Sequence, residues 1–148
     1  MELGLYLESV SRKSKRVAAM VEEFDDGKLD PHYLGYFHCF NKQLFYEAHE
    51  VLEHLWLHDK YGPNGAFYKG LIQLAGAFVH LQRNHLRPAA ALFKLAGANL
   101  EKYPHIHEHL NMQTTCTLAR KWLDDLERTR FEINPLTSQA APELKLEK

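Results

Sequence analysis

Three acids and two histidines interrupt a segment that otherwise has the pattern of a core helix. Residues 45–56 read Phe-Tyr-Glu-Ala-His-Glu-Val-Leu-Glu-His-Leu-Trp. The apolar side chains recur with the spacing of one helical face. His49 and Glu53 fall on the edge of that face, one turn apart, where an imidazole and a carboxylate can pair. Glu53 can then fix the tautomer of His49 and raise its basicity, as in a general base.

A second polar stripe lies on the next predicted helix, residues 65–84. The rest of that helix is apolar, so it is expected to be buried, and Gln73 and His80 then need partners inside the protein. We expect the stripe to face His49 and Glu53, with all four side chains in hydrogen-bonding range directly or through one water. Its members share about 100° of the helix circumference: Lys69, Gln73, Gly76, Ala77, His80 and Asn84.

Two known metal-binding spacings do not fit these residues. A zinc protease helix needs His-Glu-x-x-His, but the last position of that pattern is Glu53 here. Di-iron bundles need Glu-x-x-His pairs, which the chain lacks. A mixed site of His49, Glu53 and His80 still suits zinc or a non-haem metal. The stripes therefore permit a ligand site, a metal site or a purely structural hydrogen-bond network.

Other reactive residues give weaker signals. Cys39 and Cys116 form no Cys-x-x-Cys pair, and Cys39 lies among aromatic residues, as an inert core thiol does. Residues 105–109 contain three alternating histidines, but no strand pattern surrounds them, which indicates a polar connection between helices. His54 and His58 are expected on the solvated side of their helix.

The elements that position these residues are all predicted to be helices. We expect an all-α, irregular array or bundle of about five to six helices in a single domain over residues 1–133. Asp30 suits an N-cap and Pro31 a first helical position. The helix 65–84 is the most apolar and is placed at the centre, antiparallel to its predecessor, because only about six residues connect them. Residues 134–148 lose periodicity and are expected to form a flexible tail or to dock on a neighbour. The predicted helices span residues 5–24, 31–40, 43–58, 65–84, 88–104 and 112–128.

Composition excludes several classes of protein. The 148 residues carry a formal charge of −1, so binding of nucleic acid by bulk charge is not expected. The longest apolar run, residues 71–81, is too short for a membrane span, and no secretory segment follows Met1, so we expect a cytoplasmic protein. Four aromatic residues within 33–40 exceed what one amphipathic face buries, which predicts a homo-oligomer.

Two motifs resemble those of domain-of-unknown-function family 309, a family of small bacterial and archaeal helical proteins. They are Phe40-Asn41 followed by the segment 45–56, and residues 68–75 followed by His80 and Asn84. The likeness covers about residues 35–103 and implies an all-α array of about five helices without an established activity. Gln43 stands where a glycine is common in that family. The signature positions that the resemblance implies are His49, Glu50, Glu53, Trp56, Gln73 and His80. If Glu50 is buried, its helix must be covered on two sides.

Two functions are compatible with these patterns. The first is a binding protein or enzyme whose internal His/Glu/Gln site takes a small polar ligand or a metal ion. It requires the polar side chains to converge on a pocket that solvent can reach. The second is a non-catalytic helical interaction module or scaffold, which requires an exposed apolar groove. Self-similarity along the chain falls short of the three units that a repeat array needs.

Overall fold

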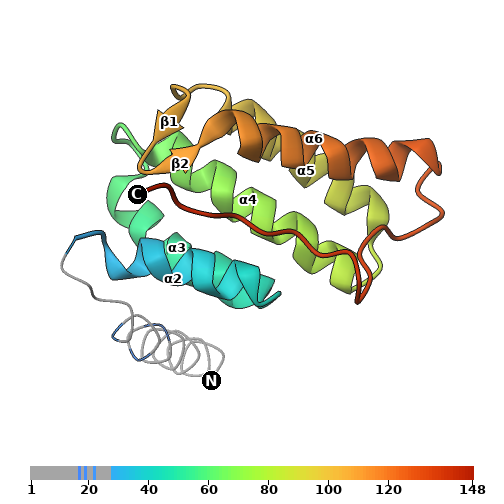
Figure 1. Cartoon of the computed structure of the whole chain (residues 1–148), viewed down its shortest axis with the longest axis horizontal. Helices are drawn as coiled ribbons and strands as arrows, with labels where there is room; N and C mark the ends of the chain where they lie inside the picture. Colours follow the sequence, from blue (N-terminus) through green and yellow to red (C-terminus); the bar gives the residue numbers. More distant parts are fainter. Residues whose placement is uncertain (1–16, 18, 20–21, 23–27) are drawn as a thin grey trace, which may run out of the picture.

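Residues 28–148 contain five helices and one small hairpin in the computed structural model (Figure 1). The structure describes these residues and also Val17, Ala19 and Glu22, which are helical. The all-α class is confirmed, and each helix predicted from residue 31 onward is present. The helix predicted over residues 5–24 lies largely outside the described residues. The elements are α2 (Pro31–Asn41), α3 (Phe45–Asp59), α4 (Gly65–Gln82), α5 (Leu86–Leu100), β1 (Ile106–His107), β2 (Leu110–Asn111) and α6 (Met112–Arg128).

Helix α4 lies at the centre, with α3 against one side and α5 against another (Figure 1). Its hub is Phe78, which is fully buried. The Phe78 ring packs against one aromatic ring from each of the other four described helices, with centroid distances from 4.9 to 5.6 Å: Phe40, Phe45, Phe93 and Trp122. One side chain therefore links α2, α3, α4, α5 and α6.

Local chemistry explains where these helices begin and end. A side-chain oxygen of Asp30 accepts a hydrogen bond from the His32 backbone N–H at 2.8 Å, which caps α2 as expected. Gln43, in the turn before α3, has a φ of 62°. This left-handed conformation favours glycine, the residue that the motif resemblance implied for this position. Asn84 follows α4 with a φ of 59°, and asparagine tolerates this conformation better than most residues.

The four aromatic residues of α2 are all buried within this one chain: Tyr33, Tyr36, Phe37 and Phe40. The Tyr36 hydroxyl donates to the Leu71 carbonyl of α4 at 2.7 Å, and the Tyr33 hydroxyl donates to the Glu108 carbonyl of the hairpin at 2.6 Å. Several elements thus cover α2, where the sequence pattern suggested only one covered face. These aromatics do not require a second subunit, and the homo-oligomer stays a prediction without their support.

The segment 105–109 contains part of a hairpin, so the prediction of a connection without strands is wrong. Ile106 pairs with Asn111, and His107 pairs with Leu110. The turn residues Glu108 and His109 both have left-handed backbones, with φ of 48° and 62°. Two-residue strands are too short to show alternation, and this turn lacks the usual Asn-Gly or Asp-Gly signal.

Residues 134–148 are here called the C-terminal strap, and they lie along the helices. Figure 1 shows the strap running back across α4 towards the hairpin. The Asn41 amide donates to the Leu144 carbonyl at 2.7 Å and accepts from the Leu144 N–H at 2.8 Å. The Leu144 side chain is only 3% exposed, and Leu146 forms a β-bridge with Leu110. An extended segment has no helical period, so the lost periodicity did not reveal this docking.

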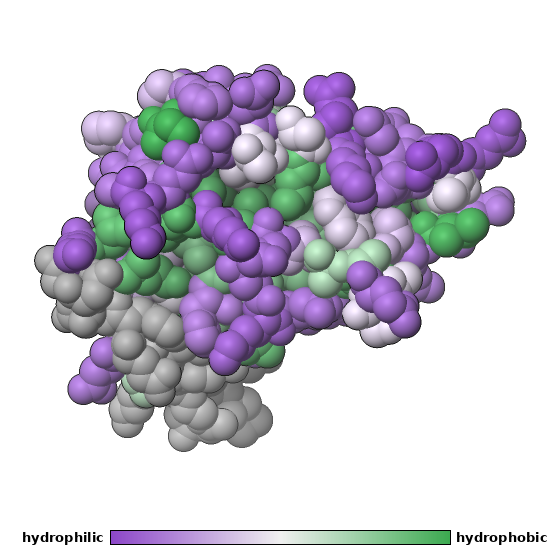
Figure 2. Space-filling model, in the orientation of Figure 1, coloured by the Kyte–Doolittle hydropathy of each residue, from purple (hydrophilic) through white to green (hydrophobic). Residues whose placement is uncertain are grey.

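The face seen in Figure 2 is mostly hydrophilic, with hydrophobic side chains gathered towards its middle. Among the described helices, none has both the length and the apolar character needed to cross a bilayer.

Candidate functional site

The predicted contact between His49 and Glu53 forms on α3. The His49 Nε2 atom lies 3.1 Å from a Glu53 carboxylate oxygen, and the two side chains are 29% and 31% exposed. Their neighbours Ala48 and Leu52 are fully buried, which leaves the pair at the edge of the core-facing surface of α3. A half-buried imidazole beside a carboxylate is suited to accepting a proton from a bound molecule.

Three of the sequence-predicted side chains line one open cavity of about 300 Å³. The cavity lies between α3, α4 and α5, so the small and polar stripe of α4 borders the same space as His49. Glu53, Glu50 and Trp56 are not among its described lining residues. Those residues are Tyr46 and His49 from α3, Lys69, Ile72, Gln73, Gly76, Val79 and His80 from α4, and Leu92 from α5.

The expected four-residue hydrogen-bond network is present only in part. The Gln73 side-chain oxygen accepts from the Asn99 amide of α5 at 2.8 Å, so its partner comes from a helix that the prediction did not consider. The His80 Nδ1 atom is buried and has no hydrogen-bond partner among the described residues. The cavity, rather than direct contact, therefore brings His49, Gln73 and His80 together.

The surroundings of His80 disfavour its protonated form. Burial lowers the pKa of His80, and the positive charges of His85 and Arg83 lower it further. The His80 and His85 ring centroids are 5.9 Å apart. A neutral imidazole can donate from one nitrogen and accept at the other. The buried Nδ1 atom is a polar group without a partner among the described residues, and leaving such an atom unpaired costs about 1–3 kcal/mol.

His80 is expected to contribute to loss of stability in mild acid. Below about pH 6.5 the unfolded chain takes up a proton at this imidazole before the folded protein does, so falling pH favours unfolding. Above that pH the His80 ring is neutral in both the folded and the unfolded state, so it does not make the stability depend on pH. Urea unfolding at about pH 7.5 and about pH 5.5 should show a smaller acid loss for His80→Asn than for the wild type. The exposed His105→Asn serves as the control, and an equal loss in all three proteins would refute the prediction.

Trp56 and Glu50 occupy other parts of α3. The Lys69 ammonium lies 4.5 Å from the centroid of the Trp56 ring, and Lys60 lies 5.8 Å from it. Glu50 is 2% exposed, and Val17 packs against its neighbour Val51. Helix α3 is therefore covered on a second side, as a buried Glu50 requires.

In the part of the chain that the structure describes, no group of three or more His, Cys, Asp or Glu side chains is arranged to hold a metal ion. The predicted candidates His49, Glu53 and His80 form no such group. In the hairpin, His107 Nε2 lies 2.7 Å from the Asn64 side-chain oxygen, within hydrogen-bonding distance. His54 and His58 are exposed, as expected, and His54 also stacks on His32 of α2 at 4.6 Å between ring centroids.

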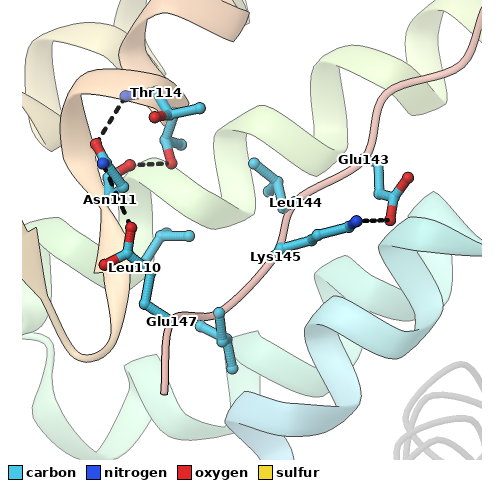
Figure 3. Close-up of a pocket in the computed structure, with 9 residues that line it drawn as sticks. Leu110, Asn111, Thr114, Glu143, Leu144, Lys145 and Glu147 are labelled. Carbon is cyan, nitrogen blue, oxygen red and sulfur yellow. Dashed lines mark hydrogen bonds and ion pairs between the residues drawn. The ribbon is translucent and has the colours of Figure 1, made fainter.

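A second cavity, of about 370 Å³, lies between the C-terminal strap and the start of α6 (Figure 3). Leu110, Asn111 and Thr114 form one wall, and residues 143–147 of the strap form the other. The Asn111 side-chain oxygen accepts from the Thr114 N–H at 3.0 Å, as the N-cap of α6. This cavity contains none of the sequence-predicted side chains, and part of its polar lining caps a helix.

Some residues of the first cavity were not predicted as site residues. Tyr46 lies three positions before His49, and Lys69 lies four positions before Gln73. Lys69 was already placed on the predicted polar stripe, though not named as a site residue, and Tyr46 shares a helical face with His49, a spacing that could have identified it. Leu92 and Asn99 belong to α5, and no sequence signal gives the register of α5 against α4.

Comparison with known proteins supports the resemblance seen in the motifs. Residues 33–92 match the family model described as a domain of unknown function (DUF309). The matched segment runs from α2 into α5. It contains the six positions that the motif resemblance implied and all nine described lining residues of the cavity. No curated protein and no solved structure matches the chain significantly.

Proposed function

We propose that this chain, whose residues 33–92 match DUF309, binds a small and partly apolar molecule in the cavity between α3, α4 and α5. One observation carries the proposal: His49, Gln73 and His80 come from separate turns of two helices and border one open space. Ile72, Val79 and Leu92 supply apolar walls. A few polar groups set among apolar ones are typical of small-molecule sites.

The size of the cavity restricts the ligand. Its volume of about 300 Å³ lies at the small end of the range for ligand pockets. Since a water molecule in the liquid occupies about 30 Å³, the space holds roughly ten waters. A metabolite of similar bulk fits, whereas a dinucleotide or a folded peptide does not.

The described lining favours binding, with proton transfer as the reaction type that it best supports. His49, paired with Glu53, is the group placed to take a proton from a bound molecule. None of the nine described lining residues is a serine, threonine or cysteine, so that lining offers no hydroxyl or thiol nucleophile of these types.

Filling the cavity from its α4 wall should abolish binding. A Cβ atom at Gly76 would lie 3.2 Å from a methyl carbon of Leu92. Both residues line the cavity, so the side chain introduced by Gly76→Leu should fill the space beside Leu92. Gly97 of α5 is the matched control, because a Cβ atom there would meet nothing within 4 Å. We expect NMR screening of small organic acids, amides and amines to shift the His49, Gln73 and His80 resonances in the wild type and in Gly97→Leu. In Gly76→Leu the affinity should fall at least about tenfold.

Two results would contradict this proposal. The first is that no compound of any charge shifts the cavity resonances at millimolar concentration. The second is that binding survives in a folded Gly76→Leu protein, because the ligand would then occupy another place. Circular dichroism and thermal unfolding of both glycine variants establish that each is folded before the comparison is made.

The alternative function is a helical interaction module. Tyr46 and Leu95 support it, because they are 44% and 50% exposed on two of the helices that border the cavity. Such a module would lose its protein partner on Leu95→Glu while the binding of small molecules remained unchanged.

A further inference from the structure

We infer, building on the proposed function of the cavity, that its ligand is a singly charged carboxylate with a short apolar body. The inference starts from the balance of charge. Of the nine described lining residues, Lys69 is cationic, two are histidines and none is acidic. The nearby acid Glu53 contacts His49 at 3.1 Å. Lys69 therefore supplies the uncompensated charge of the described lining.

The Trp56 ring holds the Lys69 ammonium without neutralising it. Nζ lies 4.5 Å from the ring centroid, which is a cation–π contact that orients the ammonium and leaves its positive charge in place. Among the ion pairs of the described residues, none involves Lys69, which is half-buried. An anion at this end of the cavity would gain a charge-assisted hydrogen bond in partly desolvated surroundings.

The other polar groups of the lining also favour an acceptor. The Gln73 oxygen is already used by Asn99, so the amide N–H groups are what the Gln73 side chain can offer a ligand, and they are donors. At the far end, burial lowers the pKa of His80, and the nearby Arg83 guanidinium lowers it further and adds positive charge there. A ligand cation would meet repulsion there, whereas an anion would be stabilised.

The lining fits one negative charge better than two. No arginine is among the described lining residues, and arginine is the side chain that most often recognises phosphate through two hydrogen bonds. Gln73 and Gly76 lie in the middle of α4, where backbone N–H groups are already used by the helix and do not form the anion site of a helix start. One ammonium and one amide suit a carboxylate.

The rest of the cavity selects the body of the ligand. Ile72, Val79 and Leu92 present only hydrocarbon, and Gly76 leaves room between them. A chain or ring of a few carbons would bury its surface there and gain about 25 cal/mol per Å² removed from water. Short aliphatic or small aromatic acids combine this body with the required head group.

The test uses compounds that share one body and differ in charge. Hexanoate, hexanamide, hexylammonium and hexyl phosphate are titrated into the wild-type chain and followed by NMR at the cavity residues. We expect hexanoate to bind at least about tenfold more tightly than hexanamide, and hexylammonium to bind most weakly. Lys69→Gln should reduce the affinity for hexanoate to that for hexanamide. Lys60→Gln is the matched control, because Lys60 lies over the same Trp56 ring but outside the cavity lining, and it should change nothing.

Each other outcome overturns a distinct statement. If hexanamide or hexylammonium binds as tightly as hexanoate, the inferred charge is wrong while small-molecule binding stands. If hexyl phosphate binds more tightly than hexanoate, the ligand is a phosphate ester rather than a carboxylate. If none of the four shifts the cavity resonances, the proposed function itself fails. If Lys69→Gln fails to fold, the relative affinities of the four compounds for the wild-type chain decide the charge of the ligand.

Discussion

Replacing Phe78 with alanine should destabilise the protein by about 3–5 kcal/mol. The side chain is fully buried and packs against one ring from each of the four other described helices. Truncation removes all four contacts at once and leaves a cavity at the point where the helices meet. The surrounding helices cannot close this cavity easily, because moving one helix into the space would pull it away from its other neighbours.

Urea unfolding followed by circular dichroism measures this effect. Tyr61→Ala is the control, because Tyr61 is 93% exposed and its loss should change stability by no more than about 0.5 kcal/mol. Phe78→Leu keeps most of the volume and should fall between the two. A loss below about 1 kcal/mol for Phe78→Ala would mean that the aromatic hub does not hold the helices together.

Leu144→Ala should cost about 2–5 kcal/mol, although its position lies in a segment without any predicted secondary structure. The side chain is 3% exposed, and its backbone forms two hydrogen bonds with Asn41. Asn41→Ala should destabilise as well, because it leaves a half-buried N–H and a carbonyl without partners, at about 1–3 kcal/mol each.

Ile133→Ala provides the comparison for the strap, because Ile133 is an aliphatic residue close to this segment but 64% exposed. Thermal or urea unfolding of Leu144→Ala, Asn41→Ala and Ile133→Ala tests this prediction. A truly flexible tail would make all three indistinguishable from the wild type, and that result would overturn the docking of Leu144.

Periodicity and capping chemistry predicted most of the helical fold. The helix from Met112 to Arg128 has the predicted bounds, and Asp30 caps α2 as its side chain suggested. The hairpin and the strap could not be predicted in the same way. Both depend on contacts between distant segments, such as Leu110 with Leu146, that leave no local pattern.

The candidate site could be predicted where its geometry is local. His49 and Glu53 are one turn apart on a single helix, so their contact follows from spacing alone. The Gln73 partner could not be inferred, because Asn99 is 26 residues away on a helix of unknown register. Only the resemblance indicated that Glu50 matters, because the helical projection of the sequence places Glu50 off the apolar face of α3.

The contact between Asn41 and the strap also has a consequence for the order of folding. Asn41 and Leu144 are 103 residues apart in the chain, whereas α3, α4 and α5 pack against their immediate successors. Closing a long loop loses more entropy than joining neighbouring helices, so helix pairing should come first and strap docking last. Interactions formed after the rate-limiting barrier act on the rate of unfolding rather than on the rate of folding. The strap would then work as a latch on the finished helical array, slowing its opening without guiding its assembly.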